Sequence, residues 1–107
     1  MKFTNISSEW NPKLSGSHYV GEVQTTSSQL KRAFGSPHII EPAALDNKTR
    51  VEWTIEWEDG ALCTIYDWKC SPIPVHLVDE WNVGGFSKEV VDRVEKELER
   101  VTQQERA

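Results

Sequence analysis

"VEWTIEWEDGALCTIYDW", residues 51–68, is the stretch that decides the fold. Aromatic and β-branched residues alternate with polar ones on both sides of Asp59-Gly60, a pair favoured in the two-residue turns of β-hairpins. A two-residue turn fixes the register and places Glu52 opposite Asp67, and an extra loop residue would shift that register by one. One face of the predicted hairpin then carries Val51, Trp53, Ile55, Trp57, Leu62, Thr64, Tyr66 and Trp68.

Weaker patterns flank the hairpin on both sides. Residues 17–25 are expected to form a short strand, and residues 75–83 a further strand of the same sheet. Thr26 opens a capping box for a short helix that ends at Gly35. A second helix is expected from about Ser87 to Gln104, because its valines and its leucine share one face.

These elements predict an α+β fold. The central hairpin and one or two further strands would form a small antiparallel sheet, with two helices packed on the tryptophan face. Residues 1–16 show no period and are expected to form a loosely attached arm, followed by a single domain over residues 17–107.

Composition excludes several classes of function. The chain has 107 residues, a net charge of −5 and a pI near 5.1, which argues against direct binding to nucleic acid phosphates. It shows neither a signal peptide nor an apolar run of membrane-spanning length, so we expect a cytoplasmic protein without membrane contact. Scattered histidines and the absence of known catalytic motifs predict no metal, no cofactor and no catalytic residue.

"WNVGGFSKEV", residues 81–90, allows two interpretations. In the first, Gly84 and Gly85 only turn the chain from strand to helix, and Ser87 caps that helix. In the second, the helix N-terminus binds a phosphate, because its free N–H groups suit an anion and Lys88 adds positive charge. The complete candidate site for such a phosphorylated or nucleotide ligand is Gly84, Gly85, Ser87 and Lys88 with Lys69, Tyr66 and Trp81.

A row of acids on the second face of the hairpin is a candidate protein-contact surface. It comprises Glu52, Glu56, Glu58 and Asp67. The three glutamates would lie about 7 Å apart in succession, so they could imitate a phosphate backbone toward a basic partner. Glu52 opposite Asp67 would be a repulsive pair that solvent, a cation or a basic partner must offset.

The hairpin and the glycine segment together resemble a group of small proteins of phages and other viruses. The resemblance covers about residues 28–98 and rests on "VEWTIEWEDGALCTIYDWK", "EWNVGGFSK" and the Phe34-Gly35-Ser36-Pro37 segment. It implies a viral origin but lends no fold and no named activity. Small viral proteins of this kind often counter a host defence by blocking a protein or by sequestering a signal nucleotide.

The sequence therefore favours a non-enzymatic viral binding protein that acts on a host defence protein or a signalling nucleotide, with assembly into a homo-oligomer left open. Two alternatives stay open. One is an enzyme acting on a phosphorylated or nucleotide substrate at Gly84–Lys88, and the other is an accessory or structural protein of a virion.

Overall fold

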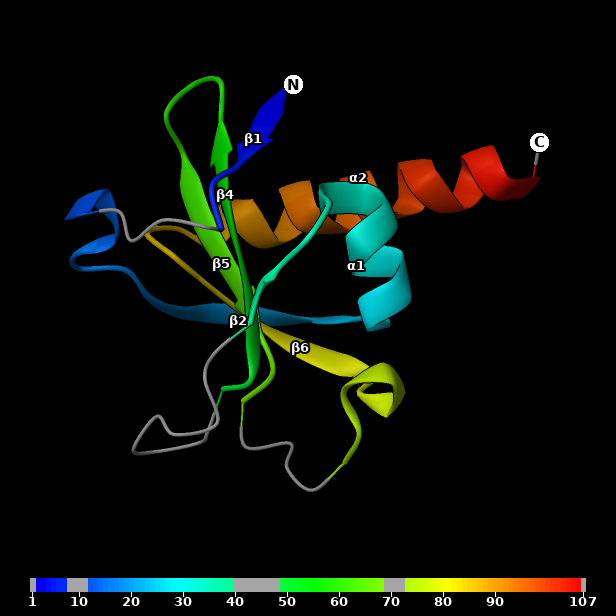
Figure 1. The fold of residues 1–107 in the computed structure, drawn as a ribbon. Helices are drawn as coiled ribbons and strands as arrows, with labels where there is room; N and C mark the ends of the chain where they lie inside the picture. The colour runs from blue at the N-terminus through cyan, green and yellow to red at the C-terminus, as the bar shows by residue number, and fades with distance from the viewer. Residues whose placement is uncertain (1, 8–11, 40–48, 69–72, 107) are drawn as a thin grey trace.

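A computed structural model describes residues 2–7, 12–39, 49–68 and 73–106 (Figure 1). Its six-stranded antiparallel sheet has the order β1-β4-β5-β6-β2, and β3 also pairs with β4. The strands are β1 (Phe3–Asn5), β2 (His18–Gln24), β3 (His38–Ile39), β4 (Val51–Trp57), β5 (Leu62–Tyr66) and β6 (Glu80–Gly85). The helices are α1 (Ser27–Phe34) and α2 (Glu89–Arg106), and the short 3-10 turns are η1 (Pro12–Leu14) and η2 (Val75–Leu77).

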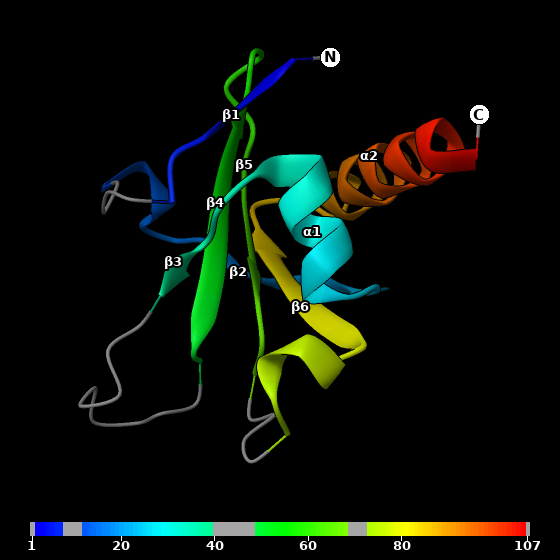
Figure 2. The same cartoon turned by 45° about the vertical axis from the view of Figure 1, so that its right-hand side comes forward.

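Both helices pack on the same face of the sheet, which confirms the predicted α+β arrangement (Figure 2). That face buries Trp53, Trp57 and Trp81 together with the branched aliphatic residues of β4, β5 and β6. Removing this apolar area from water is the main term that stabilises the domain. Neither helix is long and apolar enough to cross a membrane, as far as the described residues go.

The predicted register of the central hairpin is wrong by one residue. Trp57 faces Ala61, with the Trp57 N–H donating to the Ala61 carbonyl at 2.8 Å, so the loop has three residues rather than two. Gly60 has φ +89°, the left-handed conformation that such a loop requires after its first turn. Cys63, Ile65 and Asp67 therefore join the tryptophan face, while Leu62, Thr64 and Tyr66 move to the other face.

The N-terminal residues are more ordered than their sequence suggests. Phe3–Asn5 forms β1, an edge strand paired with β4, so this part of the predicted arm belongs to the sheet. The Asn5 side chain donates to the carbonyls of Phe34 and Ser36 at 2.8 Å each, which ties β1 to the end of α1. Phe3 packs against Phe34 with a centroid distance of 5.1 Å.

The predicted strand over residues 75–83 is only partly correct, because residues 75–77 form η2 and the strand begins at Glu80. The caps of α1 confirm the sequence prediction in part. Thr26 Oγ1 accepts from the Gln29 N–H at 3.2 Å, and Gly35 ends the helix with φ +91°. The reciprocal bond of the predicted capping box is not formed, because Gln29 Oε1 accepts no hydrogen bond from the described residues.

Candidate functional site

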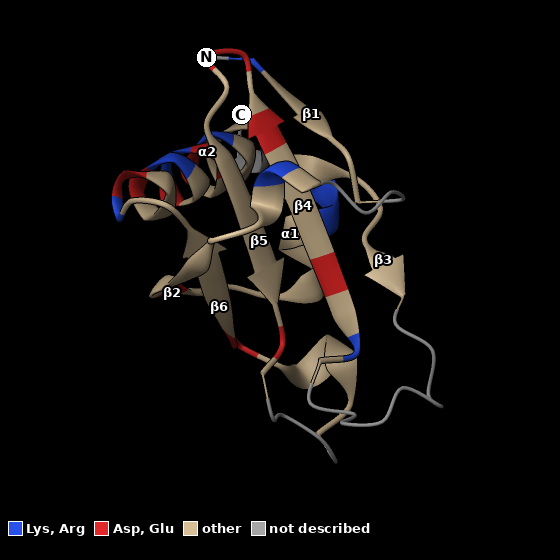
Figure 3. Ribbon diagram, turned by 90° about the vertical axis from the view of Figure 1, so that its left-hand side faces the viewer, with Lys and Arg blue, Asp and Glu red and all other residues tan. Residues whose placement is uncertain are grey.

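The second face of the sheet has no helix on it and is the candidate functional surface (Figure 3). Ladder partners share a face, so the register determines which side chains gather there. The segment with η1 crosses one end of this face, where Lys13 forms an ion pair with Glu56 at 3.3 Å. We call the remaining part the open face; it comprises Tyr19, Glu22, Glu52, Tyr66, Glu80 and Asn82, with Trp68 directly after β5.

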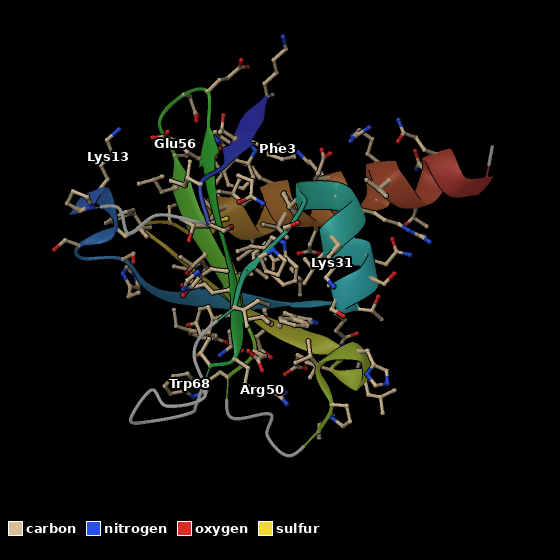
Figure 4. All side chains as sticks on the ribbon, viewed as in Figure 1. Phe3, Lys13, Lys31, Arg50, Glu56 and Trp68 are labelled. Carbon is tan, nitrogen blue, oxygen red and sulfur yellow. The ribbon has the colours of Figure 1, made fainter. Side chains whose placement is uncertain are left out.

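Aromatic side chains form part of the open face. Tyr66 and Trp68 meet edge to face, with ring centroids 6.3 Å apart, and Trp68 points away from the helices (Figure 4). Trp68 is 43% exposed and Tyr19 is 52% exposed, values that are high for rings of this size. Exposed tyrosine and tryptophan are the residues that most often supply binding energy in protein interfaces.

Carboxylates adjoin these rings on β2 and β6. The Tyr19 hydroxyl donates to Glu22 Oε1 at 2.7 Å, which raises the pKa of Tyr19. Glu80 lies close to Glu22 on the neighbouring strand, and the interaction between their carboxyl groups raises the pKa of Glu80 and lowers that of Glu22. Two acids therefore lie close together on an exposed surface, where a cation would relieve their repulsion.

Glu52 sits on the same face opposite Tyr66, with His38 of β3 on its other side. Burial raises the pKa of Glu52, and the nearby His38 acts in the opposite direction. Burial also raises the pKa of Tyr66, which hydrogen-bonds Asn82. This part of the open face is polar and half-buried, in contrast to the exposed Tyr19 and Trp68 rings.

The four predicted protein-contact acids do not form one row. Glu52 and Glu56 lie on the face without helices, Glu58 is exposed in the hairpin loop, and Asp67 lies on the opposite face. The predicted Glu52–Asp67 repulsion is absent, because the three-residue loop moves these residues to different faces. Asp67 is 0% exposed and its carboxylate is neutralised by Arg50 Nε at 2.7 Å.

Gly84 and Gly85 lie inside β6, so the prediction that they turn the chain before a helix is wrong. Both are buried between β5 and β2, with Gly84 paired to Thr64 and Tyr19 and Gly85 paired to Cys63 and His18. A Cβ on Gly84 would lie 2.6 Å from Thr64 Oγ1, and one on Gly85 would lie 2.9 Å from Val90 Cγ2. Close packing of neighbouring side chains is thus a sufficient reason for glycine at both positions.

We expect Gly84→Ala to lower the free energy of unfolding by about 1–3 kcal/mol, because the new methyl group overpacks against Thr64. Thr64→Ala removes the clashing oxygen, so the double variant should recover part of that loss. Urea denaturation followed by circular dichroism on both single variants and the double variant measures the coupling. Strictly additive losses would contradict this account of the glycine.

The structure does not bring the other predicted ligand-binding residues to one surface. Trp81 is 0% exposed in the core, whereas Lys88 is exposed before α2. Ser87 Oγ accepts from the Glu89 N–H at 3.1 Å, so its hydroxyl caps the helix as the simpler interpretation predicts. Tyr66 lies on the open face, and Lys69 lies outside the described residues.

A hollow of about 500 Å³ lies beside the N-terminus of α2. Leu62, Phe86 and Val90 line it together with Asp59 and Arg93, whose ion pair at 2.7 Å lowers the pKa of Asp59 to about 2. Arg93 also pairs with Glu89, one helical turn earlier on α2, at 2.9 Å. These charges satisfy one another, so the hollow offers less for ligand recognition than the open face.

Sequence reasoning missed the residues from β2 and β6 that complete the open face: Tyr19, Glu22, Glu80 and Asn82. Strict alternation over residues 17–25 would place Tyr19 and Glu22 on opposite faces of the strand. They share a face because the register with β6 shifts between Tyr19 and Gly21, and only the topology shows that β6 lies beside them. Cys63 is free and buried, and burial raises the pKa of its thiol, which makes it unreactive. No cluster of His, Cys, Asp or Glu suited to a metal ion occurs in the described parts of the chain.

Comparisons with protein-family models, with curated proteins and with solved structures found no match to the chain. The functional argument therefore rests on the chemistry of the open face.

Proposed function

We propose that the chain is a non-enzymatic viral binding protein that counters a host defence by occupying a basic protein partner. The observation that carries the binding role is the open face, where exposed Tyr19 and Trp68 lie among Glu22, Glu80 and Glu52. The viral setting rests on the resemblance of the hairpin and glycine segments alone.

The chemistry of the open face favours a partner rich in arginine or lysine. Carboxylates bind guanidinium and ammonium groups through charge-assisted hydrogen bonds. Aromatic faces add cation–π attraction, which strengthens when the contact is desolvated. Arginine is also enriched in interfaces, because its flat side chain satisfies both kinds of contact.

Binding, rather than catalysis, is the better account of this surface. General acid–base chemistry needs titratable groups that converge on a substrate shielded from water, and the Glu22 and Glu80 side chains are exposed to solvent. Sequestration of a nucleotide is the weaker version of the proposal, because Trp81 and the glycines are buried away from Lys88.

The test is quantitative affinity purification from cells infected with the virus that encodes the protein. A variant with Glu22→Lys and Trp68→Ala should recover a basic host protein at least about tenfold less efficiently than the wild type, since it loses a charge contact and an aromatic anchor. The recovered protein is then purified and its Kd measured directly by calorimetry.

Glu99→Lys serves as the matched control, because it makes the same change in charge at an exposed position of α2. It should recover the partner as well as the wild type does. Equal recovery by the open-face variant and by the control would refute the proposal.

A further inference from the structure

The outer edge of β2 is unpaired in the described structure. β2 ends the sheet and runs for seven residues, from His18 to Gln24. The opposite edge of the sheet offers only short strands, because the three-residue β1 and the two-residue β3 lie along β4 there. Long open edges can accept another strand, and short ones resist it.

The ladder with β6 shows which backbone groups face outward from this edge. The Thr25 N–H donates to the Asp79 carbonyl at 3.0 Å, and hydrogen-bonded pairs alternate along an antiparallel ladder. Val23 and Gly21 therefore bond to β6, whereas Glu22 and Gln24 direct their N–H and C=O groups away from the sheet. No hydrogen bond from another described residue reaches these outward backbone groups.

A hollow of about 600 Å³ runs along the same edge. Its charged lining residues, among those described, are all acidic: Glu22 and Glu80 on the side of the open face, and Glu95 of α2 on the other side. Val23 and Leu98 supply apolar surface between them. The edge thus combines free backbone groups, negative charge on both sides and an apolar strip.

We infer that β2 binds a basic, extended segment of the partner as an additional strand of the sheet. Backbone hydrogen bonds to Glu22 and Gln24 would supply affinity, and alternate side chains would supply specificity. Lysine or arginine side chains on one side of the added strand reach Glu22 and Glu80. Those on the other side reach Glu95, with their aliphatic stems on Leu98.

Charge selects this occupant over a second copy of the chain. Pairing of two β2 edges would bring the Glu22 and Glu80 carboxylates of both copies together, and like charges across a ladder are destabilising. A basic segment instead neutralises them. The inference rests on the proposed function and specifies how the partner is held.

The probe is a synthetic peptide of repeated Lys-Lys-Thr-Thr, which places lysines on both sides of an extended strand, titrated into the full chain by calorimetry. Gln24→Pro removes one outward N–H, and proline is tolerated on an edge strand. Its matched control is Gln24→Ala, which keeps the N–H and removes the side chain. We expect Gln24→Pro to bind about tenfold more weakly than Gln24→Ala, because both variants lose the Gln24 side chain but only the former loses a backbone hydrogen bond.

A second experiment changes the peptide instead of the protein, so its result does not depend on whether the Gln24→Pro variant folds. Methylating the peptide nitrogens that face β2 should weaken binding, and methylating those that face away should not. In NMR spectra, the amides of Glu22 and Gln24 should gain protection from exchange when the peptide binds.

The two proposals fail in different ways. If the peptide binds but neither Gln24→Pro nor nitrogen methylation matters, strand addition is refuted, while charge recognition by the open face stands. Absence of peptide binding, tighter binding of a glutamate–threonine peptide, or a dimer of the chain in native mass spectrometry would also overturn strand addition. Equal recovery of the host protein by the open-face and control variants would refute the proposed function itself.

Discussion

Replacing Asp67 with alanine is expected to lower the free energy of unfolding by about 3–5 kcal/mol, because the change removes one partner of a buried ion pair. The Asp67 carboxylate accepts from Arg50 Nε at 2.7 Å and from the backbone N–H groups of Arg50 and Val51 at 2.8 and 3.0 Å. All three donors lose their acceptor in the variant. Urea denaturation followed by circular dichroism measures the loss.

Two further variants, one at Asp67 and one in the loop of the same hairpin, test this role. Asp67→Asn keeps an oxygen for the two backbone donors but loses the charge and the acceptor for Arg50 Nε, so we expect a smaller cost of about 1–3 kcal/mol. Glu58→Ala removes an exposed acid from the loop of the same hairpin and should change stability by about 0.5 kcal/mol or less. If Asp67→Ala costs no more than Glu58→Ala, the structural role assigned to Asp67 is wrong.

The role of Asp67 shows where sequence reasoning about the hairpin stops. Strand propensity and Asp59-Gly60 predict both strands correctly, and they also predict a turn between them. The number of loop residues is decided by contacts made after folding, including the ion pair of Asp59 with Arg93 of α2. A one-residue difference then exchanges the faces of β5 and moves Asp67 from a surface acid to a buried anchor.

A local signal for this anchor does exist in the sequence. Arg50 precedes β4 and Asp67 follows β5, so the two opposite charges bracket the open end of the hairpin. In the observed register they meet and close that end. The predicted two-residue turn instead places Glu52 opposite Asp67, with Arg50 as only one of several groups that could offset the two acids.

Predictions from local sequence patterns held best where neighbouring residues alone determine the structure. Thr26, Leu30 and Gly35 define α1, and the structure confirms its cap, its buried face and its end. The open face depends on long-range topology instead, because β2 and β6 lie side by side although the whole hairpin separates them in sequence. Periodicity can show that Glu22 lies on one side of a strand, but not that Glu80 lies next to it.

The tryptophans show the same limit of sequence analysis. The sequence does not reveal which tryptophans lie in the core and which lie on a binding surface. Trp81 is 0% exposed, its indole N–H donates to the Val78 carbonyl at 3.3 Å, and its ring meets Trp53 edge to face at 5.5 Å. Trp68 is 43% exposed at the end of the open face. The two residues are therefore assigned opposite roles, the first in stability and the second in binding.

Trp81→Ala is accordingly expected to lower the free energy of unfolding by about 3–5 kcal/mol, because it leaves a large cavity between the sheet and the helices. Trp68→Ala should cost about 1 kcal/mol or less, since much of its ring already contacts water. It should nevertheless weaken capture of a basic partner, whereas a Trp81 variant that remains folded should not. Urea denaturation and the binding assay on both variants measure the two effects. A stable Trp81→Ala protein would mean that this side chain is not part of the core, and it would restore Trp81 as a candidate for stacking on a ligand.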